Sequence, residues 1–300
     1  MDSPTINLMT LMRERVLALC AEGNLDEALH AANASVEKAQ QLLSPDFDTI
    51  DAFASALEVR ADLTRQMGLL EGARDDYKQA IDQLDNRPDR FDQLGRLHAG
   101  LGAVYDADGK PERAAELWEQ AMRYFEKADP PLPLDVAAMA NNLAFLKKAQ
   151  GDMEIAESHF LKALEILHNT LGPDHEETAS VSNNLGALYH AAGYHEQARE
   201  MHMMALEARR KSLGDNHPDT AQSHNNLALA MLETGDRAWA RRHFEKALLA
   251  FEQLGPECAA DLDATASNYC SFLRGEGEEQ LASIIEGRVH RVLEACAAKA

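Results

Sequence analysis

The segment TASVSNNLGALYHAAGYHEQAREMHMMALEARRKSL, residues 178–213, contains one complete unit of the pattern that decides the fold of this chain. Val181, Leu185 and Leu188 recur at helical spacing, which predicts a first helix from about 178 to 192. Gly193 follows at the point where a residue in the left-handed conformation can end a helix. The unit therefore opens with a helix that ends in a glycine turn.

A second helix is predicted from about Glu196 to Ser212, and Leu213-Gly214 ends it. Its inward side chains are Ala198, His202, Ala205 and Leu206. Pro218 can then open the following helix at its first position, where no backbone donor is needed. Helix, turn, helix and loop make up the unit.

Glycines at a nearly constant interval indicate that this unit recurs along the chain, each followed five residues later by an alanine. The glycines are Gly23, Gly68, Gly109, Gly151, Gly193, Gly235 and Gly277; the alanines are Ala28, Ala73, Ala114, Ala156, Ala198, Ala240 and Ala282. The interval is 42 residues in the second half, and the first two intervals are 45 and 41. We therefore predict a single array over residues 1–300, because a stack of repeats grows without a domain boundary.

Charge and composition exclude several function classes. Asp and Glu outnumber Lys and Arg by 50 to 29, a net charge of −21 that argues against nucleic acid as a partner. No phosphate loop, nucleophile elbow or His-Glu-x-x-His pair occurs, and an open array offers no closed pocket for catalysis. We predict a protein that is not an enzyme and binds neither cofactor nor metal.

The location is expected to be cytoplasmic. The first four residues lack a basic leader, and no stretch approaches the roughly 18 uncharged residues of a transmembrane segment. The four cysteines are scattered and form no Cys-x-x-Cys, which argues against a disulfide framework or a zinc site: Cys20, Cys258, Cys270 and Cys296.

The pattern Leu185-Gly186-x-x-Tyr189, with Ala198 and a bulky residue four positions later, resembles the tetratricopeptide repeat. The ring and alanine of the second helix recur as Tyr77 with Ala80, Trp118 with Ala121, Phe160 with Ala163, and Phe244 with Ala247, whereas His202 with Ala205 places an imidazole there. The resemblance implies an all-α, right-handed superhelical solenoid of about seven helix-turn-helix repeats.

A narrower resemblance covers residues 136–255. Asn-Asn-Leu-(Ala or Gly) recurs at 141–144, 183–186 and 225–228, and Leu-Gly-x-x-His-x-x-Thr-Ala at 171–179 and 213–221. This style is similar to the repeats of kinesin light chains. Because no heptad coiled coil precedes the first repeat and the loops are short, the chain most resembles the bacterial kinesin-light-chain-like proteins. Some of these are associated with bacterial tubulin filaments, which makes a tubulin-like filament a partner implied by the resemblance.

The end repeats depart from the pattern. Arg15 and Arg60 stand where leucine is expected, and Glu286 replaces the ring of the last helix. Terminal repeats of a solenoid face solvent, so we expect residues 262–300 to form a capping repeat.

Asparagines mark one position of the first helices, which line a concave groove in this architecture. They are Asn142, Asn184, Asn226 and Asn268, and three are preceded by Asn141, Asn183 and Asn225. Asparagine is a poor residue for a helix interior, so the recurrence needs a reason. Each amide could bind the backbone of an extended peptide, or it could hydrogen-bond across to the neighbouring repeat. Both roles stay open.

Further residues of the predicted groove follow on the same face: Phe145, Lys148, His190, Leu229 and Arg274. They suit a peptide with hydrophobic anchors and an acidic group, although Lys148 and Arg274 could equally be solvated charges. The N-terminal part of the groove is more acidic and could take a different ligand; its charged residues are Glu58, Asp62, Arg65 and Asp106.

Two basic runs, residues 209–211 and 241–242, stand out in an acidic chain. They could contact an acidic protein or an anionic membrane surface. The first run ends a helix, where cations complement the helix dipole, and this is the simpler explanation. Likewise, His175 and His217 lie in turns between repeats and His202 in a packing position, so the fold is the expected reason for them.

These observations predict a non-catalytic adaptor or scaffold that binds a partner protein or peptide along the concave face. Two alternatives remain: a structural protein that decorates a filament through its convex face, and a regulator that senses a peptide.

Overall fold

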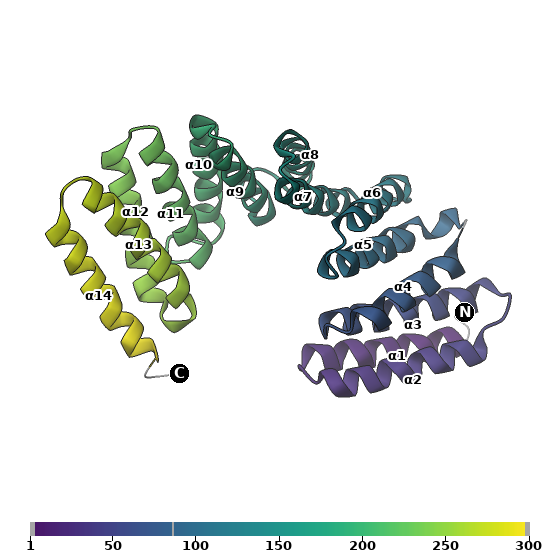
Figure 1. The fold of residues 1–300 in the computed structure, drawn as a ribbon. Helices are drawn as coiled ribbons and strands as arrows, with labels where there is room; N and C mark the ends of the chain where they lie inside the picture. Colours follow the sequence, from purple (N-terminus) through teal and green to yellow (C-terminus); the bar gives the residue numbers. More distant parts are fainter. Residues whose placement is uncertain (1–3, 86, 298–300) are drawn as a thin grey trace. The chain divides into compact units, whose positions relative to one another are not determined.

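The computed structural model describes residues 4–85 and 87–297, with side chains over residues 7–85 and 87–294. Over these residues the chain forms 14 α-helices and two short 3-10 helices, and no strand (Figure 1). The all-α prediction is confirmed. The ends of the predicted array, residues 1–3 and 298–300, lie outside the described residues.

The α-helices alternate between the first (A) and second (B) helix of successive repeats. The A helices are α1 (Pro4–Ala21), α3 (Phe47–Gln66), α5 (Phe91–Ala107), α7 (Pro133–Gln150), α9 (Glu176–Ala191), α11 (Pro218–Glu233) and α13 (Ala259–Gly275). The B helices are α2 (Leu25–Leu42), α4 (Leu70–Leu84), α6 (Pro111–Lys127), α8 (Met153–Leu171), α10 (His195–Ser212), α12 (Arg237–Leu254) and α14 (Glu279–Ala297). The 3-10 helices η1 (Pro88–Arg90) and η2 (Pro256–Cys258) precede α5 and α13.

The helices belong to two compact units, Met1–Leu146 and Lys147–Ala300, and the division falls within α7. In the first unit α1 packs on α2, α3 on α4, and α5 on α6; in the second, α9 packs on α10, α11 on α12, and α13 on α14. Within each unit a B helix also contacts the next A helix, as α10 contacts α11. One continuous array over residues 1–300 stays a prediction.

The seven glycines that mark the repeats all have positive φ, between 70° and 85°. Gly193 shows why. The N–H of Tyr194 donates to the carbonyl of Tyr189 at 2.8 Å, and the N–H of Gly193 donates to the carbonyl of His190 at 3.1 Å. This pair of bonds is the Schellman motif, which requires a left-handed residue after the last helical turn.

Close contact between the two helices of a pair depends on the alanines of the B helices. All seven marker alanines, from Ala28 to Ala282, have no exposed surface. The rings predicted to pack beside them are also buried: Tyr77, Trp118, Phe160, His202 and Phe244.

The facing residue on the A helix is matched to the ring. A Cβ added to Gly186 would lie 2.8 Å from Cε1 of His202, and one added to Gly102 would lie 2.6 Å from Cδ1 of Trp118. These two repeats therefore need glycine where others carry alanine.

Ion pairs add a second link between successive repeats in the second unit. Arg199 contacts Asp236 at 2.6 Å, and Arg241 contacts Glu278 at 2.7 Å. In both pairs a B helix contacts the turn that precedes the next B helix, and the partners are 37 residues apart because the repeat is regular. Lys211 at the end of α10 also contacts Asp174, in the loop before α9, at 3.0 Å.

Three glycine substitutions separate backbone conformation from packing. Gly193→Ala should lower the free energy of unfolding by about 1 kcal/mol, because a Cβ disfavours the left-handed conformation although no atom lies within 4 Å of it. Gly186→Ala should cost about 1–3 kcal/mol by forcing His202 away. Gly275→Ala, with ordinary φ and open space, is the control and should be nearly neutral. Urea unfolding of the three variants measures this, and equal losses at Gly186 and Gly275 would contradict the close approach.

Candidate functional site

The predicted groove residues lie on A helices of both units. Asn141, Asn142 and Phe145 lie on the part of α7 that belongs to the first unit, and Lys148 lies near its end in the second unit. The others are Asn183, Asn184 and His190 on α9, Asn225, Asn226 and Leu229 on α11, and Asn268 and Arg274 on α13. Because α9 contacts α11 and α11 contacts α13, the second unit brings its part of the set onto neighbouring helices.

Hydrogen bonds join the asparagines of successive repeats. Nδ2 of Asn226 donates to Oδ1 of Asn183 at 2.9 Å, and Nδ2 of Asn268 donates to Oδ1 of Asn225 at 3.2 Å. In both bonds the donor, Asn226 or Asn268, stands at the second position of the Asn-Asn pattern. The acceptor, Asn183 or Asn225, stands at the first position of this pattern in the preceding repeat. The amides therefore tie A helices together, which is the second of the two roles considered for them.

The same amides keep hydrogen-bonding capacity. A carboxamide has two N–H donors and an oxygen that accepts twice. Asn226 uses one donor on Asn183 and accepts from Gln222 at 2.9 Å, while Asn268 donates to Asn225. Asn183, Asn226 and Asn268 are half-buried, whereas Asn225 is buried. The row is held in place by its own bonds and still faces solvent in part.

The residues that flank the amides have different surroundings. Phe145 is 45% exposed, Leu229 packs partly against the core of the second unit, and the ring of His190 lies 5.8 Å from that of His195. Arg274, by contrast, is bound by α14: its guanidinium contacts Glu279 at 3.1 Å and Glu286 at 2.7 Å.

The ion pair with Arg274 explains why Glu286 departs from the repeat pattern. The carboxylate occupies the position that a ring fills in other repeats, and it holds the guanidinium of the facing helix. Sequence reasoning considered Arg274 as a ligand-binding or a solvated cation and missed this partner.

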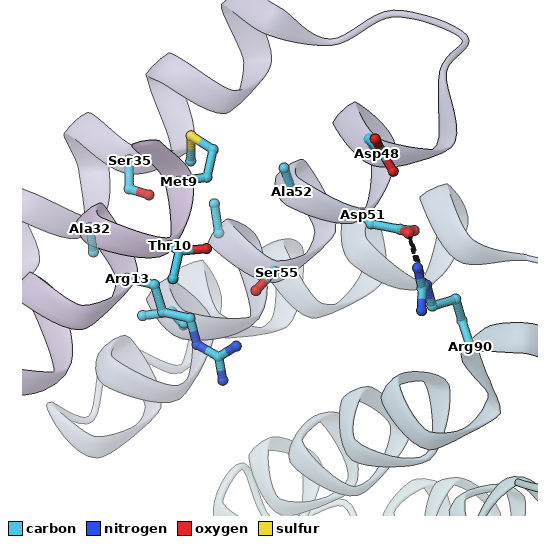
Figure 2. Close-up of a pocket in the computed structure, with 12 residues that line it drawn as sticks. Met9, Thr10, Arg13, Ala32, Ser35, Asp48, Asp51, Ala52, Ser55 and Arg90 are labelled. Carbon is cyan, nitrogen blue, oxygen red and sulfur yellow. Dashed lines mark hydrogen bonds and ion pairs between the residues drawn. The ribbon is translucent and has the colours of Figure 1, made fainter. Parts of the chain in front are cut away.

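A cavity of about 270 Å³ lies between α1, α2 and α3 of the first unit (Figure 2). Met9 and Ala32 contribute apolar surface, and Asp51 is paired with Arg90. Ser35, which is only 4% exposed, also lines the cavity. No sequence pattern indicated this cavity, because its lining comes from three α-helices and η1, which share no motif.

The acidic residues expected to define the N-terminal groove are largely engaged within the protein. Glu58 accepts from Gln93 at 2.8 Å and from Arg96 at 3.0 Å, and Asp62 accepts from the hydroxyl of Tyr77. These bonds join A helices to one another or to a B helix. A separate ligand for the acidic N-terminal repeats stays a prediction.

His175, His217 and His202 have structural roles, as the sequence predicted. Nδ1 of His175 accepts from the N–H of Glu177, and Nδ1 of His217 accepts from that of Asp219, so both cap the A helix that follows. His202 is buried and its Nδ1 lies 3.1 Å from Oδ1 of Asn183. Within the described residues no group of three or more His, Cys, Asp or Glu side chains is arranged to hold a metal ion.

The two basic runs differ from a simple surface patch. Arg209 is buried and donates to Oγ of Ser223 at 2.8 Å, and burial lowers the pKa of its guanidinium. Arg210 is paired with Asp215 at 2.6 Å. In the second run Arg241 is paired with Glu278, whereas the guanidinium of Arg242 lies over the ring of Trp239 at 4.9 Å. The expectation that residues 209–211 only end a helix missed the interior role of Arg209.

Comparisons with known proteins agree with this architecture. The tetratricopeptide repeat model matches residues 135–211 and 180–253. The crystal structure of BtubC, a bacterial kinesin light chain from P. vanneervenii, is 30% identical over 75% of this chain and 90% of that chain, with a TM-score of 0.65. No curated protein sequence matches the chain.

Two more distant structures show the fold alone. A kinesin light chain repeat protein of Podosopora anserina is 22% identical and covers 67% of this chain and 95% of that one, with a TM-score of 0.56. The apo form of RapI is 13% identical and covers 97% of this chain and 98% of that one, with a TM-score of 0.66.

The chain belongs to the tetratricopeptide-repeat family. Within that family it is of the kinesin light chain type and is similar to the bacterial kinesin light chain BtubC. Such repeats support a role in protein–protein interaction. None of the helices in the described part of the chain is long and apolar enough to cross a membrane.

A double-mutant cycle tests the amide link between repeats. Asn183→Ala and Asn226→Ala should each lower the free energy of unfolding by about 1 kcal/mol, because each removes the same hydrogen bond. The double variant should lose less than the sum, with a coupling of about 0.5–1.5 kcal/mol measured by urea unfolding. Strict additivity would mean that the bond contributes nothing in solution.

Acid should destabilise the second unit through two buried histidines, His202 and His224, and the half-buried His243. Burial lowers the pKa of His202 to about 4, of His224 to about 3 and of His243 to about 4. The unfolded chain binds these protons near pH 6.5, so stability is complete above that pH and is lost as the pH falls from 6.5 toward 4. His202 contributes about 1.4 kcal/mol per pH unit, and the contacting pair His224 and His243 adds to the loss in the same direction.

The measurement is the urea midpoint between pH 7.5 and 5. His202→Phe, which places there the ring found at Phe160 and Phe244, should reduce the slope of stability against pH. An unchanged slope in His202→Phe would contradict the assignment.

Proposed function

We propose that the protein is a non-catalytic cytoplasmic adaptor that binds an extended segment of a partner protein on its A-helix face. This face is defined here as the surface of α9, α11 and α13 that carries Asn183, Asn184, Asn226, Asn268 and Leu229 with Ala187 and Ser271. The observation that supports the proposal is the pair of cross-repeat bonds, which hold the amides of Asn226 and Asn268 in place while both side chains stay only half-buried.

Fixed amides suit an extended ligand. An extended peptide presents backbone N–H and C=O groups in a regular series, and a carboxamide can satisfy either. Because the cross-repeat bonds already hold the amides in one orientation, binding does not have to order them, which reduces its entropic cost. Leu229 and the small side chains of Ala187 and Ser271 leave space for ligand side chains between the amides.

Similarity to BtubC supports a more specific version of the proposal, in which the partner is a subunit of a bacterial tubulin-like filament. This chain has a net charge of −21. The partner surface that contacts the A-helix face should therefore not be strongly acidic, because like charges repel. In this version the protein attaches to the filament as an accessory component.

Site-specific photo-crosslinking tests which face binds. A benzophenone amino acid at residue 187 or 271 reports the A-helix face, and the same group at Leu161 or Ile284, both exposed on B helices, is the matched control. In native cytosol, and with polymerised bacterial tubulin in a parallel sample, we expect one protein adduct at 187 and 271 that is roughly tenfold stronger than at the control positions, equivalent to about 1.4 kcal/mol of preference. An adduct confined to residues 161 and 284 would instead place the contact on the B helices.

A further inference from the structure

The B helices of the second unit form a second candidate binding surface. A cavity of about 530 Å³ opens between the B helices α10 and α12, and its floor is formed by Leu227 and Met231 of α11. Its walls include Met203 and Leu206 from α10 and Trp239 and His243 from α12. We call this the B-helix pocket. It is separate from the A-helix face and does not depend on the function proposed for that face.

The apolar groups at the mouth of the pocket are open to solvent. Met203 is 50% exposed and Trp239 is 54% exposed, whereas Leu206 and Leu227 beneath them are buried. Methionine and tryptophan are enriched at protein interfaces, where they supply large contact areas. Burial lowers the pKa of His243 to about 4, so this wall is uncharged at neutral pH.

The charge around the pocket differs from the rest of the chain. Residues 195–254, which form α10 to α12, contain eight Lys and Arg against nine Asp and Glu, whereas the remainder contains 21 against 41. Most of the acidity of the protein therefore lies elsewhere.

The carboxylates that line the pocket are already ion-paired: Glu207 contacts Lys211 at 3.2 Å, and Asp236 contacts Arg199 at 2.6 Å. The guanidinium of Arg242 lies over the ring of Trp239 at 4.9 Å, and no carboxylate of the described residues forms an ion pair with it. The pocket therefore has a cation without an ion-pair partner beside its exposed indole.

We propose that the B-helix pocket binds an amphipathic helix of a partner protein, with its apolar side chains in the pocket and a carboxylate on Arg242. The backbone groups of α10 and α12 are used within the helices, so an extended peptide finds no backbone partners on this surface. A ligand must bind through its side chains. A helix that presents an apolar stripe does this without leaving its own backbone groups unsatisfied.

The test uses Trp239 as the reporter. The chain has two tryptophans, and Trp118 is buried in the first unit, so Trp118→Phe leaves Trp239 as the sole source of indole fluorescence. The probe is an amidated peptide of about 18 residues, long enough to form a helix, with Leu and Phe on one face and Glu on the other. Its counterpart has Lys in place of every Glu. The acidic peptide should shift the emission of Trp239 to shorter wavelength and bind more tightly than the basic one.

Adjacent methionines provide matched variants. Met203→Glu places a carboxylate at the pocket mouth and should weaken binding of the acidic peptide by roughly tenfold or more. Met204→Glu changes the next residue, which is 40% exposed but does not line the pocket, and should change the affinity by less than about twofold. Arg242→Glu should remove the preference for the acidic peptide over the basic one.

Each remaining outcome would overturn the proposal. Equal affinity for the two peptides would remove the role of charge, and equal effects of Met203→Glu and Met204→Glu would remove the role of the pocket. A shift in Trp239 emission with protein concentration alone would identify a second copy as the occupant. A shift with phosphatidylserine vesicles but not with the acidic peptide would identify a membrane surface instead.

Discussion

Each helix pair is held by an alanine of the B helix that is entirely shielded from water, and this close approach limits what can stand opposite it. Where the B helix supplies a large planar ring, as with Trp118 and His202, the A helix has glycine; where it supplies Phe160 or Phe244, alanine fits. Such a pair therefore packs through three matched residues: the alanine of the B helix, the ring of the B helix, and the glycine or alanine that faces this ring from the A helix.

The same packing produces two different surfaces in the second unit. Successive A helices lie in contact, so their asparagines reach each other and form bonds between repeats. Between α10 and α12 the B helices leave a cavity whose floor is the A helix α11. One surface is polar and pre-ordered, and the other is apolar with a cationic edge. A protein with both can contact two ligands of unlike chemistry.

Sequence reasoning predicted the helix pairs, the glycine turns and the buried alanines, because these are local patterns repeated at a fixed interval. It placed the asparagines on the A helices but left their role open, since the partner of Asn226 is 43 residues away. It missed the bond of Arg274 to Glu286 and the burial of Arg209, which depend on how neighbouring helices are oriented. The B-helix pocket was also missed, because an exposed methionine or tryptophan in one helix gives no sign of a gap beside the next.

The ion pairs and amide bonds between repeats join residues at separations of 37 and 43, and these values are set by the 42-residue period. A segment of one full period that is duplicated or deleted within the gene carries one donor and one acceptor of each bond, so the new junction pairs as the old ones did. A segment whose length is not a whole number of periods would leave both partners unmatched. Recombination in register is therefore a route by which such an array changes its length without losing its internal connections.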